Sequence, residues 1–378
     1  MLLRFPLFIF FFLVAGGLLA SPIFIGDSSM VAKSQRDSLS KREKVKKKIK
    51  HTGNIFLRFV RSFNEMDTAY ITPNFYNYTA MLQNTNFRQS YRLRATGDDG
   101  ATQSIQLTPE SAFKIGPYFG WRWIFLGYTF DMGHPHKAGS TTEFNLSLYS
   151  SMLGADLVYI KNTGDFKIRR IDGFGSTDIG RINFNGFNTY TGCLNLYYVF
   201  NHTRFSYPAA FAQSTVQRKS CGSWILGLRY DKQKMVFDHT KLPTELLNPT
   251  TEGGLPLIDN LKFNKINYSN YSISGGYAYN WVFAKNCLLS ASVVPAVGYK
   301  QAKGERISGE KFWMNIKNMN VDFITRLGLV WNNSVWFAGA SFVNHLYDYR
   351  RDRFSISNSV SYLNIYFGLC FNRRKEYR

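Results

Sequence analysis

Residues 114–131 read KIGPYFGWRWIFLGYTFD, and this segment is the most informative part of the chain about its fold. Its aromatic side chains are denser than a soluble core strand needs. Pro117 and Arg122 also interrupt the apolar run, which is too short for a membrane helix of about 20 residues. If the segment is extended, it supplies two short strands or one strand and its turn. One face would carry Phe119, Trp121, Trp123 and Phe125, and the other Gly120 and Arg122. An apolar outer face opposite a polar inner face is typical of a transmembrane β-barrel strand.

The N-terminal residues 1–20 have the pattern of an export signal. Arg4 precedes a Phe- and Leu-rich run from Phe5 to Leu19, and Ala20-Ser21 supplies small residues for cleavage. An uncleaved anchor helix is the alternative, because residues 22–25 are still fairly apolar. Cleavage after Ala20 would lower the formal net charge from +21 to +20, since only Arg4 is lost.

The strongly basic charge indicates an anionic neighbour. An exported protein seldom meets nucleic acid, so we expect no nucleic-acid partner. Anionic outer-membrane lipid and lipopolysaccharide are the expected partners, because basic side chains are attracted to such surfaces over a Debye length. No later stretch matches a second membrane helix in length and apolarity. The many Phe and Tyr residues therefore favour either a soluble β core or a barrel that faces lipid.

Residues 21–53 form a polar arm that ends in KREKVKKKIK at 41–50. So many basic residues predict a solvated segment, and peptidoglycan is a further possible partner of this arm. Residues 54–66 change character. Apolar side chains at helical spacing and the N-cap Asn54 predict a short amphipathic helix, at a membrane interface or across a barrel mouth. Its apolar face carries Ile55, Phe56, Phe59, Val60 and Phe63.

Apolar and polar residues alternate with a period of two along several later segments. The clearest cases are residues 190–200, 271–283 and 321–331. Each has aromatic residues at its ends, where a lipid-facing strand meets the two membrane interfaces. A soluble β-sandwich shows nearly the same alternation. The number of aromatics and the export signal favour an all-β antiparallel transmembrane barrel over the sandwich.

The last predicted strand covers residues 362–371. Leu363, Ile365, Phe367, Leu369 and Phe371 share one face, and Asn364, Tyr366, Gly368 and Cys370 share the other. The pattern Tyr366-x-Gly368-x-x-Phe371 resembles the C-terminal signal that bacterial barrel-assembly machinery reads. A basic tail, residues 372–378, follows it, whereas typical barrels end on the aromatic residue.

Counting such segments predicts a barrel of about 12 strands over residues 67–371. The longer polar stretches at 161–187, 231–267 and 300–312 are expected to be outward loops. No period of 20 to 50 residues repeats, which excludes a solenoid or a propeller.

Several blocks of the chain resemble the exported Bacteroidetes proteins grouped as domain-of-unknown-function family 4421. The blocks are FNEMDTAYI at 63–71, MLQNTN at 81–86, the stretch 114–131, SLYSS at 147–151, and 195–224. The similarity extends from about residue 50 to residue 371. It implies an exported β-barrel, but it implies no activity and no functional residues, because the family has none assigned.

Charged residues on the predicted strands are candidates for the barrel lumen. A charge that faces lipid near the midplane costs about 2 to 4 kcal/mol, so these side chains should point inward. A structural network of paired charges is favoured over a selective pore. The candidates are Arg122, Asp131, Asp156, Asp322 and Arg326.

The residues 205–211 interrupt the strand pattern. Pro208, next to Tyr207 and before two alanines, indicates a turn or an inward-folded segment that narrows the lumen. Deletion of residues 206–212 is then expected to raise permeability to small solutes.

The sequence contains no strong candidate for a metal site or a catalytic site. His134-Pro135-His136 lacks a third metal ligand, so no metal and no cofactor are expected. Ser111-x-x-Lys114 matches a nucleophile motif but runs into an extended segment at Pro117. Nothing selects His202 or His345 for a catalytic site, so no catalytic residue is assigned.

The four cysteines are few and widely spaced, although Cys193 and Cys221 could pair on neighbouring strands.

The first functional hypothesis is a non-enzymatic outer-membrane barrel, acting as a pore, a transporter element or an envelope-docking protein. An outer-membrane enzyme on lipid or lipopolysaccharide is the second, and a soluble exported β-barrel that binds an apolar ligand is the third.

Overall fold

The structure is a computed structural model that describes residues 65–121, 124–127, 130–132, 141–250, 252–306, 311–314, 319–351 and 353–375. The predicted export signal 1–20, arm 21–53 and residues 54–64 of the predicted helix lie outside these ranges. Glu65 and Met66, the last two residues of that predicted helix, are described and are not helical.

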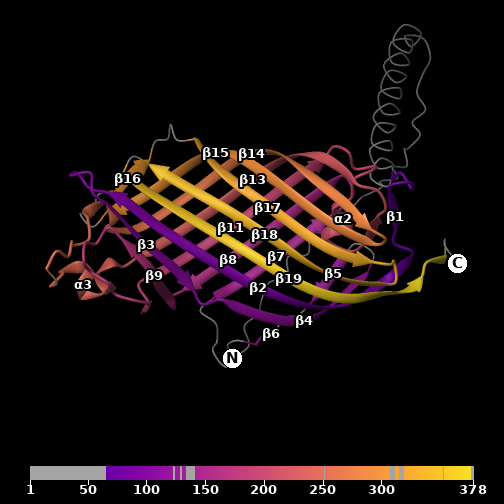
Figure 1. Cartoon of the computed structure of the whole chain (residues 1–378). Coiled ribbons are helices and arrows are strands. Elements are labelled where there is room, and N and C mark those ends of the chain that lie inside the picture. Colours follow the sequence, from indigo (N-terminus) through magenta and orange to yellow (C-terminus); the bar gives the residue numbers. More distant parts are fainter. Residues whose placement is uncertain are drawn as a thin grey trace, which may run out of the picture. The chain divides into compact units, whose positions relative to one another are not determined.

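One antiparallel sheet contains nearly all of the strands (Figure 1). Its long strands are hydrogen-bonded neighbours in the following order: β7 (Thr141–Tyr149), β8 (Leu153–Thr163), β11 (Phe187–Val199), β13 (Cys221–Phe237), β14 (Phe263–Ala284), β15 (Cys287–Arg306), β17 (Met319–Asn332), β18 (Trp336–Arg351), β19 (Phe354–Arg373), β2 (Tyr76–Thr96) and β4 (Ala112–Trp121). The all-β antiparallel prediction is therefore confirmed.

Shorter strands extend or branch from this ladder. Strands β5 (Ile124–Gly127) and β6 (Phe130–Asp131) pair with β4, and β16 (Lys311–Met314) pairs with β15. Strand β3 (Thr102–Pro109) pairs with β2 on one side and with β9 (Phe166–Asp172) on the other. Strand β9 also pairs with β10 (Ile182–Phe184). A separate pair joins β1 (Ile71–Pro73) to β12 (Thr215–Gln217). The helices are α2 (Tyr207–Phe211) and α3 (Thr244–Leu247), with short 3₁₀ turns at His239–Lys241 and Asp259–Leu261.

The four predicted alternating strands all form, as parts of β11, β14, β17 and β19. On β11, Leu194 and Leu196 are exposed, whereas Cys193 and Asn195, which alternate with them, are buried. Successive side chains of a strand point to opposite faces. The sheet therefore has an apolar outer face and a mixed inner face, as the sequence predicted. The last strand extends to Arg373, two residues into the predicted tail.

The opening stretch becomes β4 and β5, joined at residues 122–123. Phe119 and Trp121 are exposed and Gly120 is buried, so the predicted faces hold for these residues. The side chains of residues 122–129, including Arg122, lie outside the described part.

The prediction of loops at 161–187, 231–267 and 300–312 holds for the connection 238–262 and is wrong where strands continue into these ranges. Strands β8, β13, β14 and β15 continue into these ranges, and β9 and β10 lie within the first. The physical reason is a change in the outer face. Outward residues there are polar, such as Lys232 and Lys234, while inward residues such as Met235 and Phe237 remain apolar and buried. A polar outer face lowers the apolarity of the segment without ending the strand.

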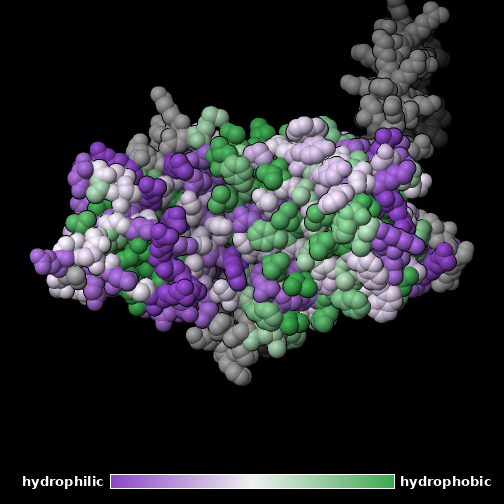
Figure 2. All heavy atoms as spheres, in the orientation of Figure 1, coloured by the Kyte–Doolittle hydropathy of each residue, from purple (hydrophilic) through white to green (hydrophobic). Residues whose placement is uncertain are grey.

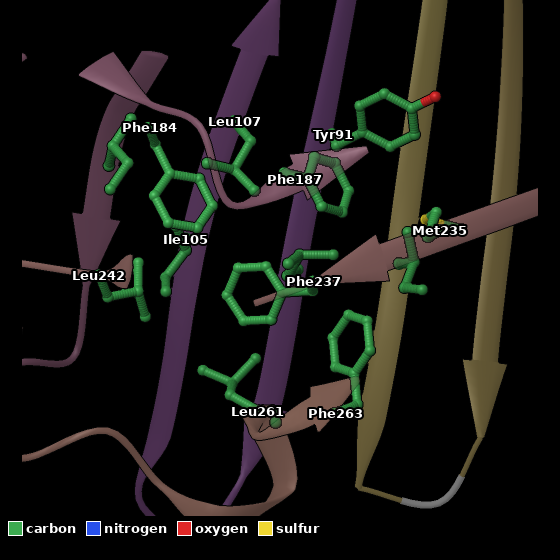
Figure 3. Close-up of a cluster of buried hydrophobic side chains, with 14 of the residues drawn as sticks. Tyr91, Ile105, Leu107, Phe184, Phe187, Met235, Phe237, Leu242, Leu261 and Phe263 are labelled. Carbon is green, nitrogen blue, oxygen red and sulfur yellow. The ribbon is translucent and has the colours of Figure 1, made fainter. Parts of the chain in front are cut away.

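These extensions enclose an apolar cluster at one end of the sheet (Figure 3). We call it the apolar cap. Rings pack edge to face within it, for example Phe187 against Phe237, and Phe237 stacks on Phe263. Its buried members include Tyr91, Leu93, Ile105, Leu107, Phe166, Ile168, Phe184, Phe187, Met235, Phe237, Leu242, Leu246, Leu261, Phe263 and Ile266.

At the opposite end, residues 200–220 between β11 and β13 fold inward. We call them the inner segment. Ser206 caps α2 by accepting a hydrogen bond from the amide of Ala209, and residues 207–210 of this helix are buried. Phe205 and Tyr207 pack with inward residues of five strands, among them Tyr197, Ile225 and Ile324.

The first and last long strands pair over their whole length. The register of β2 with β19 runs from Tyr76 opposite Arg373 to Ala95 opposite Phe354. Among the helices of the described residues, none is long and apolar enough to cross a membrane. All four cysteines are free, so the possible pairing of Cys193 with Cys221 does not occur.

Candidate functional site: the polar interior

Charged and amide side chains gather on the inner face between the inner segment and the apolar cap. Strand parity places them there, because successive side chains of a strand point to opposite faces. The buried members are Asp156, Asn162, Asn195, Arg229, Asp231, Asn270, Lys300, Asp322, Arg326, His345 and Asn358.

One group centres on Asp156 of β8. The Nη2 atom of Arg326 on β17 donates to Asp156 Oδ2 at 2.5 Å, and the side-chain amide of Asn195 donates to the same oxygen at 2.9 Å. The hydroxyl of Ser147 on β7 donates to Asp156 Oδ1 at 2.8 Å. The guanidinium of Arg326 also lies 5.3 Å from the ring centre of Tyr197. Both charges are thus paired and hydrogen-bonded, which is the condition for burying them.

A second group centres on Asp322 of β17. Lys300 Nζ lies 3.1 Å from Asp322 Oδ1, and Arg229 Nη1 lies 3.9 Å from Asp322 Oδ2. The side-chain amide of Asn270 donates to both Asp322 and Asp231 at 3.0 Å, so it connects the two carboxylates. The formal charges of this group balance, because it contains the cations Arg229 and Lys300 and the carboxylates Asp231 and Asp322.

Amide side chains form a third polar group next to the apolar cap. Asn162 donates to Gln89 at 2.9 Å and to Thr189 at 3.0 Å. Gln89 donates to Asn358 at 3.1 Å and to the hydroxyl of Tyr91, a member of the cap, at 2.8 Å. This group is therefore hydrogen-bonded to the cap.

The inner segment is tied to the strands around it. Gln213 donates to the hydroxyl of Tyr366 at 2.9 Å and accepts from Asn332 at 3.2 Å. The side-chain amide of Asn280 donates to the carbonyl of Ser206 at 2.8 Å. Tyr207 and Pro208, the expected constriction, open helix α2 and are buried.

The five lumen candidates fall into three places. Asp156 and Arg326 pair with each other, and Asp322 belongs to the second group. The backbone of Asp131 in β6 pairs with that of Lys114 in β4, but the side chain of Asp131 lies outside the described part, as does Arg122. The candidates thus do not form one common cluster among the described side chains.

Sequence reasoning missed Arg229, Asp231, Lys300 and Asn270. Two of them, Arg229 and Asp231, alternate on β13 with the exposed Leu228 and Tyr230, the pattern used for the other strands. The alternation is therefore visible in the sequence, but the polar outer face from residue 231 onward predicts a loop there.

Other sequence candidates find structural explanations. Lys114 of the Ser111-x-x-Lys114 motif pairs with Glu143 of β7 at 2.8 Å. His345 is buried on β18 and stacks on Tyr347, and His134 and His136 lie outside the described residues. Across the described ranges, no group of three or more His, Cys, Asp or Glu residues is arranged to hold a metal ion.

Solved structures with a similar fold are outer-membrane proteins. The Escherichia coli outer membrane protease OmpT is 8% identical, with a TM-score of 0.33, and the match covers 80% of this chain and 98% of that one. The Pseudomonas putida toluene transporter TodX is 8% identical (TM-score 0.23, covering 79% and 91%). The Pseudomonas aeruginosa outer membrane protein OprG is 11% identical (TM-score 0.21, covering 79% and 98%). These similarities concern the fold alone.

Curated proteins give no match to the chain. The family model described as "Domain of unknown function (DUF4421)" matches residues 65–371, which include almost every strand described above. The chain belongs to the DUF4421 family.

Proposed function

We propose that this protein is a non-enzymatic outer-membrane β-barrel with a sealed lumen, which acts as an envelope-docking protein through its outer wall and ends. One observation carries the proposal. Buried side chains fill the inner face from the inner segment, through the polar interior, to the apolar cap. A diffusion pore of porin type needs a water-filled channel along this path.

The outer face supports a membrane location. Exposed aliphatic residues occupy its middle, such as Leu228 and Ile273, which are 61% and 63% exposed. Aromatic residues flank them, as at the two interfaces of a bilayer. Tyr230, Tyr271 and Tyr299 lie toward the apolar cap, and Trp224, Trp281 and Trp331 lie toward the inner segment.

Closure of the sheet has support at two levels. Near the apolar cap, β3 pairs with β9 and β9 with β10, which leads into β11. Nearer the inner segment, the ion pair of Lys114 with Glu143 brings β4 close to β7. If β5 and β6 count as one interrupted strand between β4 and β7, the barrel has about 12 strands.

The connections favour one orientation. The connections between strands at the inner-segment end include the short turns 150–152, 285–286 and 333–335. The connection 238–262 at the cap end is long. Outer-membrane barrels have short periplasmic turns and long extracellular loops. The cap then faces outward from the cell. Export would use residues 1–20, and the C-terminal strand would engage the assembly machinery.

Two measurements test the proposal. Mature protein should remain in the outer-membrane fraction after a high-salt wash and should show heat-modifiable mobility on gels. In planar bilayers it should give no channels, with a porin as the positive control. A folded monomer in buffer without detergent would favour the soluble ligand binder. Stable conductance would favour a pore, and altered lipid A in a deletion strain would favour the enzyme.

A further inference from the structure

Three arginines project from the outer face of β2 beyond the apolar part of that strand. Arg88, Arg92 and Arg94 are exposed, while the alternate residues Gln89 and Leu93 are buried. The parity of the strand therefore directs all three guanidinium groups away from the interior. We call these residues the arginine patch.

Small hydroxyl side chains lie beside the patch on β19. The register puts Ser361 opposite Arg88, Ser357 opposite Arg92 and Ser355 opposite Arg94. Serine is too short to cover an arginine on the neighbouring strand, so the guanidinium groups stay accessible. The hydroxyl of Ser357 donates to Asp348 at 2.6 Å, and the hydroxyls of Ser355 and Ser361 remain as donors beside the patch.

The other neighbouring strand, β3, adds polar groups of the same kind. Ser104 lies opposite Arg94 and Gln106 opposite Arg92, and the side-chain amide of Gln106 donates to Ser90 at 2.9 Å. Hydrophilic residues gather over this end of the sheet, where β3 and β9 are labelled, in the face that Figure 2 shows.

Nearby basic residues have acidic partners, but the patch does not. Arg170 pairs with Asp172 at 2.8 Å, and Lys167 pairs with Glu110 at 3.3 Å. The hydrogen bond from Arg170 lowers the pKa of Asp172, and Arg92 adds a smaller effect through its charge. In the described part of the chain, no carboxylate lies within 4 Å of the guanidinium groups of the patch.

The patch begins where the apolar wall ends. On β19 the outer face is apolar from Phe371 to Leu363 and then changes to serine at Ser361, directly opposite Arg88. The apolar stretch 363–371 has the length of a tilted transmembrane strand, about 9 residues. Arg88 therefore lies at the level where lipid head groups meet the wall.

We propose that the arginine patch binds the phosphate groups of a phosphorylated glycolipid of the lipid A type in the outer leaflet. The inference rests on the proposed outer-membrane location and orientation. Guanidinium groups bind phosphate through paired, charge-assisted hydrogen bonds, and the hydroxyls of Ser355 and Ser361 supply further donors for phosphate or sugar oxygens. The acyl chains of the same molecule would lie against Leu363, Ile365 and Phe367.

Position favours a lipid over a soluble polyanion. A soluble polyanion would bind through the charges alone, whereas this patch adjoins the exposed apolar surface of β19, which begins at Leu363. A ligand with both phosphates and acyl chains uses the two surfaces together.

The test uses full mature protein purified in detergent and native mass spectrometry. The probes are bis-phosphorylated lipid A and the same lipid after enzymatic dephosphorylation. Wild type should retain the phosphorylated form at least tenfold better. The variant R88S/R92S/R94S should lose this preference, and R88K/R92K/R94K should keep part of it, because lysine retains charge without the bidentate geometry.

The matched control is R218S/K219S/K285S, which removes the same charge from exposed residues at the opposite end of the sheet. It should behave as wild type. The proposal is overturned if wild type retains both lipids equally, if the control loses as much as the patch variant, or if soluble heparin displaces the lipid. Heat-modifiable mobility and outer-membrane fractionation of each variant report separately on the barrel, so a failed barrel and a failed lipid site give different results.

Discussion

Asp156 on β8 and Arg326 on β17 form an ion pair across the interior, although 170 residues separate them in the chain. Strands β11, β13, β14 and β15 lie between β8 and β17 in the ladder. A contact across so many neighbouring strands requires that the sheet curve back on itself. The pair therefore couples opposite walls.

Breaking this pair should be costly. Arg326→Leu leaves the Asp156 carboxylate buried without its cation, and the free energy of unfolding should fall by about 3–5 kcal/mol. Urea unfolding in lipid vesicles, followed by tryptophan fluorescence, measures the change. The double variant D156L/R326L should recover most of the loss. As a control, Arg170→Leu at the exposed pair with Asp172 should change the free energy by no more than about 0.5 kcal/mol. Equal effects of the two single variants would contradict the buried role of Asp156 and Arg326.

Adjacent glycines on β14 should differ sharply in tolerance to alanine. A Cβ atom at Gly276 would overlap the backbone of Val293 and Val294 on β15, while at Gly275 it would meet nothing within 4 Å. Because the backbone of a paired strand cannot move aside, Gly276→Ala should prevent correct pairing of β14 with β15. Unboiled gel samples should show less of the compact folded band for Gly276→Ala and a normal amount for Gly275→Ala.

The apolar cap should behave as a packed core and not as a set of loops. Phe237 is fully buried there, whereas its neighbour Val236 is 40% exposed on the outer face. Phe237→Ala should lower the free energy of unfolding by about 3–5 kcal/mol. Val236→Ala should cost far less, and limited proteolysis at residues 238–262 should accelerate only in Phe237→Ala. Similar proteolysis of both variants would show that the cap does not hold this region.

Permeability should require changes at both ends. Deletion of residues 206–212 removes α2, but the buried side chains of the apolar cap remain at the other end, where they would seal the proposed barrel. The structure therefore revises the expectation from sequence. The single deletion should stay non-conducting, and a double deletion that also shortens residues 238–262 should conduct. Planar bilayer recordings distinguish these outcomes, with deletion in 238–262 alone as the control. Conductance after the first deletion alone would show that the cap leaves a passage.

The strands and their faces could be predicted because one alternation applies along the middle of each long strand. An exposed apolar residue stands at every second position, as where Leu194 and Leu196 alternate with the buried Cys193 and Asn195. In the proposed membrane location, lipid would select this apolar outer face, and water beyond the head groups would allow a polar one. The same strands then resembled loops, although inward residues such as Phe237 kept the alternation.

The interior was less accessible to sequence reasoning. Asp156, Asp322 and Arg326 were selected because charges should avoid lipid, but their partners depend on the register and curvature of the sheet. Nothing local indicates that Asp322 meets Lys300 or that Asn270 joins Asp322 to Asp231. Such pairings arise from strands far apart in the chain, so only the folded geometry reveals them.

The ladder between β2 and β19 has a consequence for biogenesis. During synthesis, β2 cannot satisfy the backbone groups on its β19 side until the final residues arrive. During that interval β2 and β18 each have a long unpaired edge that is open to aggregation with other chains. A truncated product that ends before residue 354 would keep both edges exposed permanently, so it should be prone to aggregation and proteolysis.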